Sequence, residues 1–156
     1  TIRALDDRRY ASALEIGCAH GVLTQRLNRL CDQLLAIDIS QTALALAQQR
    51  LGTQPGLEFA QMGFPADAPR GLFDLCVMSE VAYYWDAGDL SRAAQWMADH
   101  LVPGGRVVLV HYTGETDYPC TADVAVGALQ RGTSGQFTPC LAERHETYRL
   151  DLWERR

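Results

Sequence analysis

Two acidic residues, each near the end of an apolar run, are the clearest chemistry-bearing positions of the sequence. Glu15 precedes the glycine loop that begins at Gly17, and Asp38 ends a second apolar run. Gly17 can adopt backbone angles that a Cβ forbids, and its missing side chain lets a ligand approach the main chain. In doubly wound α/β folds an acid about 20 residues past such a loop binds ribose hydroxyls. The spacing of Gly17 and Asp38 therefore predicts a nucleoside-binding half.

Details of the glycine loop decide which nucleoside it fits. Gly21 stands where a helix is expected to begin, and free N–H groups there would face whatever occupies the loop. A dinucleotide fingerprint requires a second glycine where Ala19 stands and a third where Val22 stands. Both are missing, so a pyrophosphate has no obvious seat, and a nicotinamide oxidoreductase is the disfavoured alternative.

Four stretches resemble the motifs of the class I S-adenosylmethionine (SAM)-dependent methyltransferases. They are Glu15–Gly21, of the form Glu-x-Gly-x-Ala-x-Gly, then Asp38, Phe73–Val81 and Leu101–Gly105. Ala19 replaces the usual middle glycine. The run Ser79–Tyr84 is similar to the NodS-like branch, whose namesake N-methylates the free amine of a de-N-acetylated chito-oligosaccharide during Nod-factor synthesis.

The resemblance implies SAM as the cofactor, S-adenosylhomocysteine (SAH) as the product and a small molecule as the acceptor. The favoured acceptor is the amine of an amino sugar or of a de-N-acetylated oligosaccharide. An O-methyltransferase of another small metabolite and a non-catalytic SAM-binding domain are the alternatives. The expected cofactor-binding residues are Glu15, Gly17, Cys18, Ala19, Gly21, Asp38, Ile39, Gly63, Phe64 and Ser79.

Several of these positions have specific expected contacts. An unpaired carboxylate at Glu15, in a buried strand, would be costly, so we expect it to bond loop amides or the cofactor's amino group. Asp38 is expected to bind the ribose, the alternative being a helix cap shared with Ser40. Gly63 stands where the family usually carries an acid for the adenine amino group, and Phe64 could offer its backbone N–H and ring instead.

The residues after the apolar runs 73–78 and 107–110 are the candidates for catalysis. Glu80 is expected near the sulfonium or the substrate nucleophile, the alternative being a salt-bridged rim residue. His111 is a candidate general base, although a lone histidine is more often structural. Tyr83, Tyr84 and Trp85 form a dense aromatic cluster that either attracts a cation or packs against the next helix. No metal site is needed or visible.

The composition is that of an ordinary globular chain and limits the partners. The 156 residues suit one domain, 1–156, and the net charge of −5 with dispersed arginines argues against nucleic acid. No apolar run approaches the roughly 20 residues of a membrane span. Five cysteines without CxxC spacing favour a reducing, cytoplasmic setting. We expect a monomer or weak homodimer, and truncation at the N-terminus, because only fourteen residues precede Glu15.

Hydrophobic periodicity places the motifs on a regular alternation of strands and helices. The expected helices cover 23–30, 40–51, 89–101 (with Asp89 as cap) and 121–130. The expected strands are 11–16, 34–37, 57–60, 73–78 and 107–110, followed by a hairpin of 138–145 with a half-exposed 147–155. These elements predict an α/β fold, and the resemblance makes it Rossmann-like. We expect a doubly wound, mostly parallel seven-stranded sheet with a C-terminal antiparallel hairpin.

Overall fold

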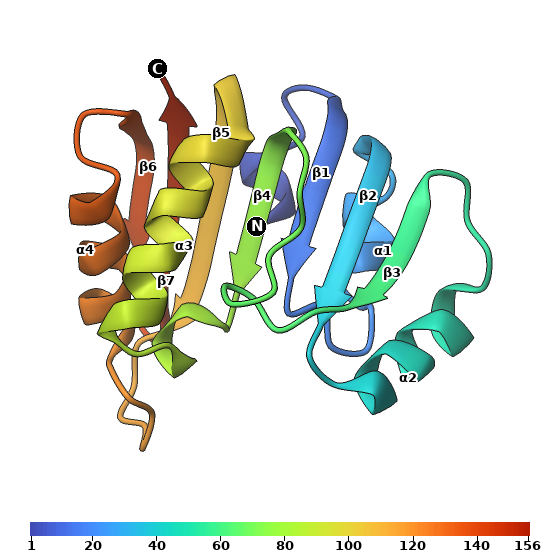
Figure 1. Cartoon of the computed structure of the whole chain (residues 1–156), viewed down its shortest axis with the longest axis horizontal. Helices are drawn as coiled ribbons and strands as arrows, with labels where there is room; N and C mark the ends of the chain where they lie inside the picture. Colours follow the sequence, from blue (N-terminus) through green and yellow to red (C-terminus); the bar gives the residue numbers. More distant parts are fainter.

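The computed structural model describes residues 1–156, and its seven strands form a single sheet (Figure 1). The strand order is β3-β2-β1-β4-β5-β7-β6. Neighbours among β1 to β5 are parallel, whereas β7 is antiparallel to both β5 and β6. The predicted Rossmann-like sheet with a C-terminal hairpin is therefore confirmed. The strands are β1 (Tyr10–Ile16), β2 (Cys31–Asp38), β3 (Leu57–Gln61), β4 (Phe73–Ser79), β5 (Leu101–Tyr112), β6 (Phe137–Arg144) and β7 (Tyr148–Arg155).

Helices lie on both faces of the sheet (Figure 1). Figure 1 shows α3 and α4 in front of the half that contains β5 and β7, with η1 and α1 behind the sheet. None of the helices combines the length and apolar character that a membrane crossing requires. The helical segments are η1 (Ile2–Ala4), α1 (Thr24–Leu27), α2 (Gln41–Leu51), η2 (Ala82–Tyr84), α3 (Ala87–His100) and α4 (Ala122–Gly132).

The central strands are buried on both faces, as their unbroken apolar sequences predict. Successive side chains of a strand point to opposite faces. Met78 accordingly joins the cluster under α3 and α4, and Val77 joins the cluster that includes Leu5 from the N-terminal segment. This double layer fixes the end of β4, from which the next residues of the site project.

Ser40 caps α2, as the sequence predicts, and Thr121 caps α4 in the same way. The Ser40 hydroxyl accepts a hydrogen bond from the Ala43 N–H at 3.2 Å, and the Thr121 hydroxyl accepts one from the Val124 N–H at 3.3 Å. Ser and Thr favour this position because their oxygen satisfies a free N–H of the first turn. The Ser40 cap, two residues after Asp38 ends β2, fixes the start of α2.

The helix after the glycine loop is shorter than its leucine spacing predicts. It contains a single turn, Thr24–Leu27, instead of extending to Leu30. The Leu30 carbonyl accepts a hydrogen bond from the Tyr10 N–H at 2.9 Å, and β2 begins at the next residue, Cys31. The helical spacing of the three leucines would extend the helix to Leu30, but the pairing of β1 with β2 ends it earlier.

Both ends of α3 also differ from the expectation. Asp86, not Asp89, caps the helix, because its Oδ1 accepts the Asp89 N–H at 2.8 Å. The helix ends at His100, before the Pro-Gly-Gly sequence, and Leu101 already pairs with Phe73 as the first residue of β5. The glycines lie within the strand, where the register between β4 and β5 is irregular.

Strand β7 is not the half-exposed strand that its alternating sequence suggests. It lies between β5 and β6, and four consecutive residues, Leu150 to Trp153, are buried. β6 takes the edge of the sheet instead. The alternation arises because Asp151, although polar, is buried and paired with Arg149 at 2.8 Å.

Candidate functional site

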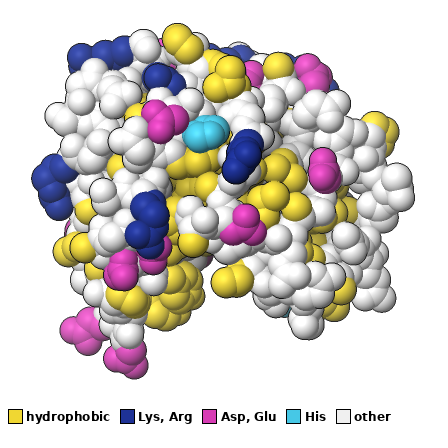
Figure 2. Space-filling view, viewed as in Figure 1, with side chains coloured by type: hydrophobic (Ala, Val, Ile, Leu, Met, Phe, Trp, Pro, Cys, Tyr) yellow, Lys and Arg dark blue, Asp and Glu magenta, His cyan; other side chains and the backbone are white.

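The carboxyl ends of β1, β2 and β4 border a cavity of about 880 Å³. Open parallel sheets bind ligands at this edge, where the strand order reverses. Figure 2 shows hydrophobic side chains along the hollow between the half of the molecule that carries α3 and the half that carries β3. The cavity brings together nine of the predicted cofactor-binding residues, namely Glu15, Gly17, Cys18, Ala19, Asp38, Ile39, Gly63, Phe64 and Ser79, and also Glu80.

Gly17 needs to be glycine for two reasons. Its φ is +74°, in the left-handed region, and a Cβ there would lie 2.3 Å from Cγ1 of Val81. Val81, which follows β4, therefore packs directly against the loop. Gly21 does not line the cavity; a Cβ at Gly21 would meet Leu51 and Ala47 of α2, so its role is to let the loop pack on that helix.

Ala19 adopts a left-handed conformation, with φ of +47°, at the place where the resembling motif usually has glycine. Such a conformation is uncommon for a residue with a Cβ and costs on the order of 1 kcal/mol or more. Asp38 offsets this by accepting the Ala19 N–H at 2.9 Å through its Oδ2. Its Oδ1 accepts the Ser40 N–H at 2.8 Å. Asp38 thus holds the glycine loop through Ala19 and the start of α2 through Ser40. Its carboxylate oxygens can each accept a further hydrogen bond from a ligand in the cavity.

Glu15 is a buried acid with an unsatisfied oxygen. It is 2% exposed, it lines the cavity, and its Oε2 has no hydrogen-bond partner. Burial raises the pKa of its carboxyl to about 8, and the neighbouring Asp38 charge adds to the rise, whereas the Thr24 hydroxyl opposes it. A buried polar atom without a partner is unfavourable. The position therefore suits a ligand that donates a hydrogen bond or carries a positive charge.

The segment after β3 forms the opposite wall. The Phe64 ring lies 5.3 Å from the Trp85 ring and 5.2 Å from the Trp96 ring, so it joins the core and also lines the cavity. Ile39 contributes an apolar rim and is 73% exposed. A flat heterocycle could pack between such apolar surfaces, next to the backbone of Gly63.

Glu80 begins the connection from β4 to η2 in a constrained conformation. Its φ is +61°, which is uncommon for a residue other than glycine and frequent at functional sites. Its Oε1 accepts the Tyr112 N–H at 2.8 Å, and its Oε2 accepts the Tyr83 hydroxyl. These two donors fix the carboxylate at the cavity, and the place of Glu80 near the reacting atoms stays a prediction.

His111 is not brought to the cavity. It is fully buried, and its Nε2 accepts the Ala82 N–H at 3.1 Å. Burial, together with the charge of Arg149, lowers its pKa to about 4, so the ring is neutral at physiological pH. His111 therefore supports η2 from below, with its ring 5.3 Å from that of Tyr83. This geometry favours a structural role for His111, which was the alternative to its expected role as a general base.

The aromatic cluster differs from the one that the sequence suggests. Trp85 turns inward against Phe64, whereas Tyr118, from the loop after β5, stacks on Tyr83 with ring centroids 4.9 Å apart. The Tyr84 hydroxyl donates to the Tyr118 hydroxyl at 3.0 Å. The sequence analysis did not identify Tyr118 as a site residue. The one feature of the sequence that points to it is its place in a loop that follows a parallel strand.

The charges that line the cavity have one sign. The carboxylates of Asp38, Glu80 and Asp89 line it together with the carboxyl group of Glu15, and no lysine or arginine does. Asp89, also missed from the sequence, lies in the first turn of α3 and is paired with the exposed Arg92 at 2.6 Å. A cavity of this kind favours cations and disfavours anions.

The sheet topology, the glycine loop and the acid that ends β2 define a nucleoside-binding α/β protein. A family model described as "Methyltransferase domain" matches residues 14–107, more than half of the chain. Nodulation protein S of Sinorhizobium fredii is 33% identical over 98 residues, which cover 62% of this chain and 45% of that protein. The match thus spans less than half the length of this relative.

Solved structures agree with the fold. A Pseudomonas syringae protein assigned as a methyltransferase has a TM-score of 0.83 and 33% identity, with 99% of this chain and 94% of that one covered. The N-methyltransferase NodS of Bradyrhizobium japonicum WM9, in complex with SAH, has a TM-score of 0.83 and 24% identity, with 97% and 81% covered. This chain therefore belongs to the methyltransferase domain family, and it shares the fold of the class I SAM-dependent methyltransferases, NodS among them.

Proposed function

We propose that this chain is a SAM-dependent methyltransferase that methylates the amine of an amino sugar or of a short de-N-acetylated oligosaccharide. The observation that carries the proposal is one cavity that joins Glu15 and Asp38 with Glu80. The first two residues suit the polar groups of the cofactor, and Glu80 suits the acceptor. The whole chain, 1–156, would act as one catalytic domain in the cytoplasm, as a monomer or weak homodimer.

The residues that line the cavity support the proposed binding of SAM. The unpartnered oxygen of Glu15 suits the ammonium group of the methionine part, and Asp38 suits the ribose hydroxyls. The backbone of Gly63 and the apolar side chains of Ile39 and Phe64 suit the adenine. The net acidic lining also suits the positive sulfonium.

When bound, SAM supplies an electrophilic methyl group: the bond to the acceptor nitrogen forms as the carbon–sulfur bond breaks, the electron pair returns to sulfur, and the nitrogen loses a proton. The protein's task is to align the acceptor, exclude water and take that proton. An alkyl amine like that of lysine has a pKa of about 10.4 and arrives protonated, so it requires a base. Glu80 would accept the proton directly or through water.

The charge of the site supports an amine over an acid as the acceptor. A carboxylate substrate would enter a cavity lined by the carboxylates of Asp38, Glu80 and Asp89 and by no lysine or arginine. An ammonium group would instead be attracted, both by Glu80 and by the face of Tyr84. The aromatic faces also suit the apolar side of a sugar ring.

The test is an SAH-release assay over a panel of acceptors. The panel contains glucosamine and its de-N-acetylated oligomers, their N-acetylated counterparts, phenols and carboxylates. We expect turnover of the free amines only, because N-acetylation removes both the nucleophile and the positive charge. Turnover confined to phenols or carboxylates would refute the amine and support an O-methyltransferase. Binding of SAH without turnover of any acceptor would favour a non-catalytic domain.

A further inference from the structure

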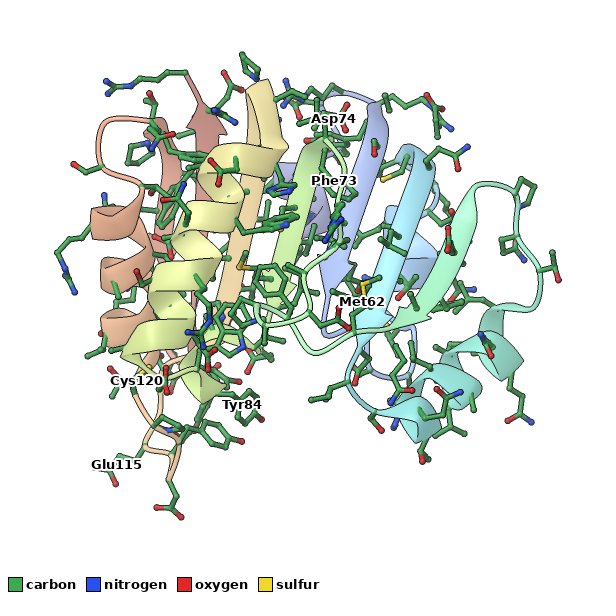
Figure 3. The ribbon with its side chains drawn as sticks, viewed as in Figure 1. Met62, Phe73, Asp74, Tyr84, Glu115 and Cys120 are labelled. Atoms are coloured by element: carbon green, nitrogen blue, oxygen red, sulfur yellow. The ribbon has the colours of Figure 1, made fainter.

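The loop between β5 and α4, residues 113–121, folds back onto η2. The Cys120 N–H donates to the Tyr83 carbonyl at 3.4 Å, and the Cys120 Sγ lies 3.8 Å from the Trp85 carbonyl oxygen. Figure 3 shows Tyr84 beside this loop, which carries Cys120 and, near its tip, Glu115. The loop is thus attached to the segment that follows Glu80, at the mouth of the cavity.

Tyr118 of this loop and Tyr84 form a continuous aromatic surface. Their ring centroids are 4.3 Å apart, and their hydroxyls are hydrogen-bonded at 3.0 Å. Tyr84 is 51% exposed and Tyr118 is 39% exposed. Large aromatic rings that pack on each other and still face solvent are typical of binding surfaces, because they combine an apolar face with a polar tip.

The position of this surface indicates which part of a ligand it would contact. Tyr84 lines the cavity, whereas Tyr118 does not, although its ring is in contact with that of Tyr84. An acceptor whose amine lies near Glu80 and which is longer than the cavity would leave it across these two rings. The same loop carries Glu115 and Asp117 and no lysine or arginine, so the surroundings favour neutral or cationic groups.

We propose that Tyr84 and Tyr118 form an outer subsite that holds the part of the acceptor projecting from the cavity, such as the second ring of an amino-sugar oligomer. The subsite rests on the proposed function of the cavity itself. The ring faces would stack on the apolar face of the sugar, and the two phenol hydroxyls would bond its hydroxyls. An ammonium group on that ring would gain further from the aromatic faces.

The test is a calorimetric titration of glucosamine, and of its de-N-acetylated disaccharide, into the protein saturated with SAH. The parent protein should bind the disaccharide more tightly than the monosaccharide. Tyr118→Ala should weaken disaccharide binding by roughly 3- to 30-fold, the range of a lost aromatic contact, and leave monosaccharide binding unchanged. Tyr118→Phe keeps the ring and loses the hydroxyl, so its affinity for the disaccharide should lie between those of the parent protein and Tyr118→Ala.

Tyr148→Ala is the matched control. Tyr148 is 37% exposed and stacks on His145 with ring centroids 4.3 Å apart, so its truncation removes a similar exposed ring, from the start of β7. It should leave the binding of both sugars unchanged. Thermal unfolding of each variant in the presence of SAH checks that η2 and the cavity keep their structure.

Three results would overturn the subsite: no preference for the disaccharide in the parent protein, an equal loss of both sugars in Tyr118→Ala, or no binding of either sugar. A disaccharide that binds through Tyr118 and is never methylated would contradict the proposed function instead and leave the subsite standing. If SAH itself does not bind, the cofactor assignment fails, and the same titration into the free protein still decides the subsite.

Discussion

The N–H of Ala19 donates to Oδ2 of Asp38 at 2.9 Å, and this bond ties the glycine loop after β1 to the end of β2. The two residues are nineteen positions apart in the sequence and belong to neighbouring strand ends. Asp38 therefore has a structural role that is independent of any ligand. Because Ala19 is held in a left-handed conformation, the same bond also stabilises a strained residue.

Asp38→Ala should weaken SAH binding at least about tenfold, because hydrogen bonds to a carboxylate contribute roughly 1.5–3 kcal/mol each. The variant should lose only about 1 kcal/mol of folding free energy, because the two hydrogen bonds that it removes, from the N–H groups of Ala19 and Ser40 to the Asp38 carboxylate, are exposed to solvent. Ser40→Ala is the control, because it removes the α2 cap and leaves the carboxylate in place. Calorimetric binding of SAH as tight as in the parent protein would contradict the ribose assignment.

Glu15 should make the ligand-free protein less stable as the pH rises. The folded protein holds the carboxyl proton up to a pKa of about 8, whereas the unfolded chain releases it near 4.5. Between these values the folded state binds more protons, so the free energy of unfolding falls with rising pH, by on the order of a few kcal/mol in all. Glu15→Gln should abolish this fall and melt at a higher temperature than the parent near pH 8.

Ligand binding should reverse the effect of Glu15. If the carboxylate accepts the ammonium group of SAH, binding requires its ionised form, so SAH affinity should rise from pH 6.5 to about 8 in the parent protein and stay flat in Glu15→Gln. The enthalpy of binding should depend on the buffer, because a proton is released. Buffer-independent enthalpies in this range would show that Glu15 does not change its protonation on binding.

The sequence predicts the glycine loop, the end of β2 and the start of α2 well, because a few neighbouring residues determine each of them. Apolar runs that end in an acid, a glycine that must have positive φ, and the Ser40 cap all act over a few residues. What fails depends on distant partners. The leucine period of α1 is overridden by the pairing of Tyr10 with Cys31, and the burial of β7 follows from its place between β5 and β6.

The acceptor side of the site shows the same division. Glu80 was predictable because residues after a parallel strand collect at one edge of the sheet. His111 follows β5 at the same edge, yet its ring turns into the core to accept the Ala82 N–H. Tyr118 meets Tyr83 only because its loop folds back over η2. Neither side-chain direction is encoded in local spacing.

His111→Phe should reduce stability without removing catalysis. The variant keeps an aromatic ring and leaves the buried N–H of Ala82 without an acceptor, which costs about 1–3 kcal/mol. The folded parent keeps His111 neutral down to a pKa of about 4, while the unfolded chain takes up a proton near 6.5. The parent therefore loses stability as the pH falls from 6.5 to about 4, and His111→Phe should lose less.

The kcat of His111→Phe distinguishes a structural role of His111 from a role as the general base. At temperatures where it stays folded, we expect kcat within about tenfold of the parent value, less than the roughly 10²–10⁴-fold that a general base contributes. A loss of kcat in the higher range, with Tm and SAH affinity unchanged, would return His111 to the role of base.

Glu80→Gln should lower kcat by roughly 10²–10⁴-fold while SAH affinity changes little. Glutamine keeps the length and shape of the side chain and can still accept one of the two bonds that hold the carboxylate, from the Tyr112 N–H or the Tyr83 hydroxyl. It cannot accept the proton of the acceptor amine. Tyr83→Phe is the matched variant, because it removes one donor and leaves the carboxylate in place, so its kcat should fall far less. Steady-state SAH release with glucosamine measures both, with melting temperatures as the check on folding. Undiminished turnover in Glu80→Gln would leave solvent as the base and reduce Glu80 to a residue that orders the turn between β4 and η2.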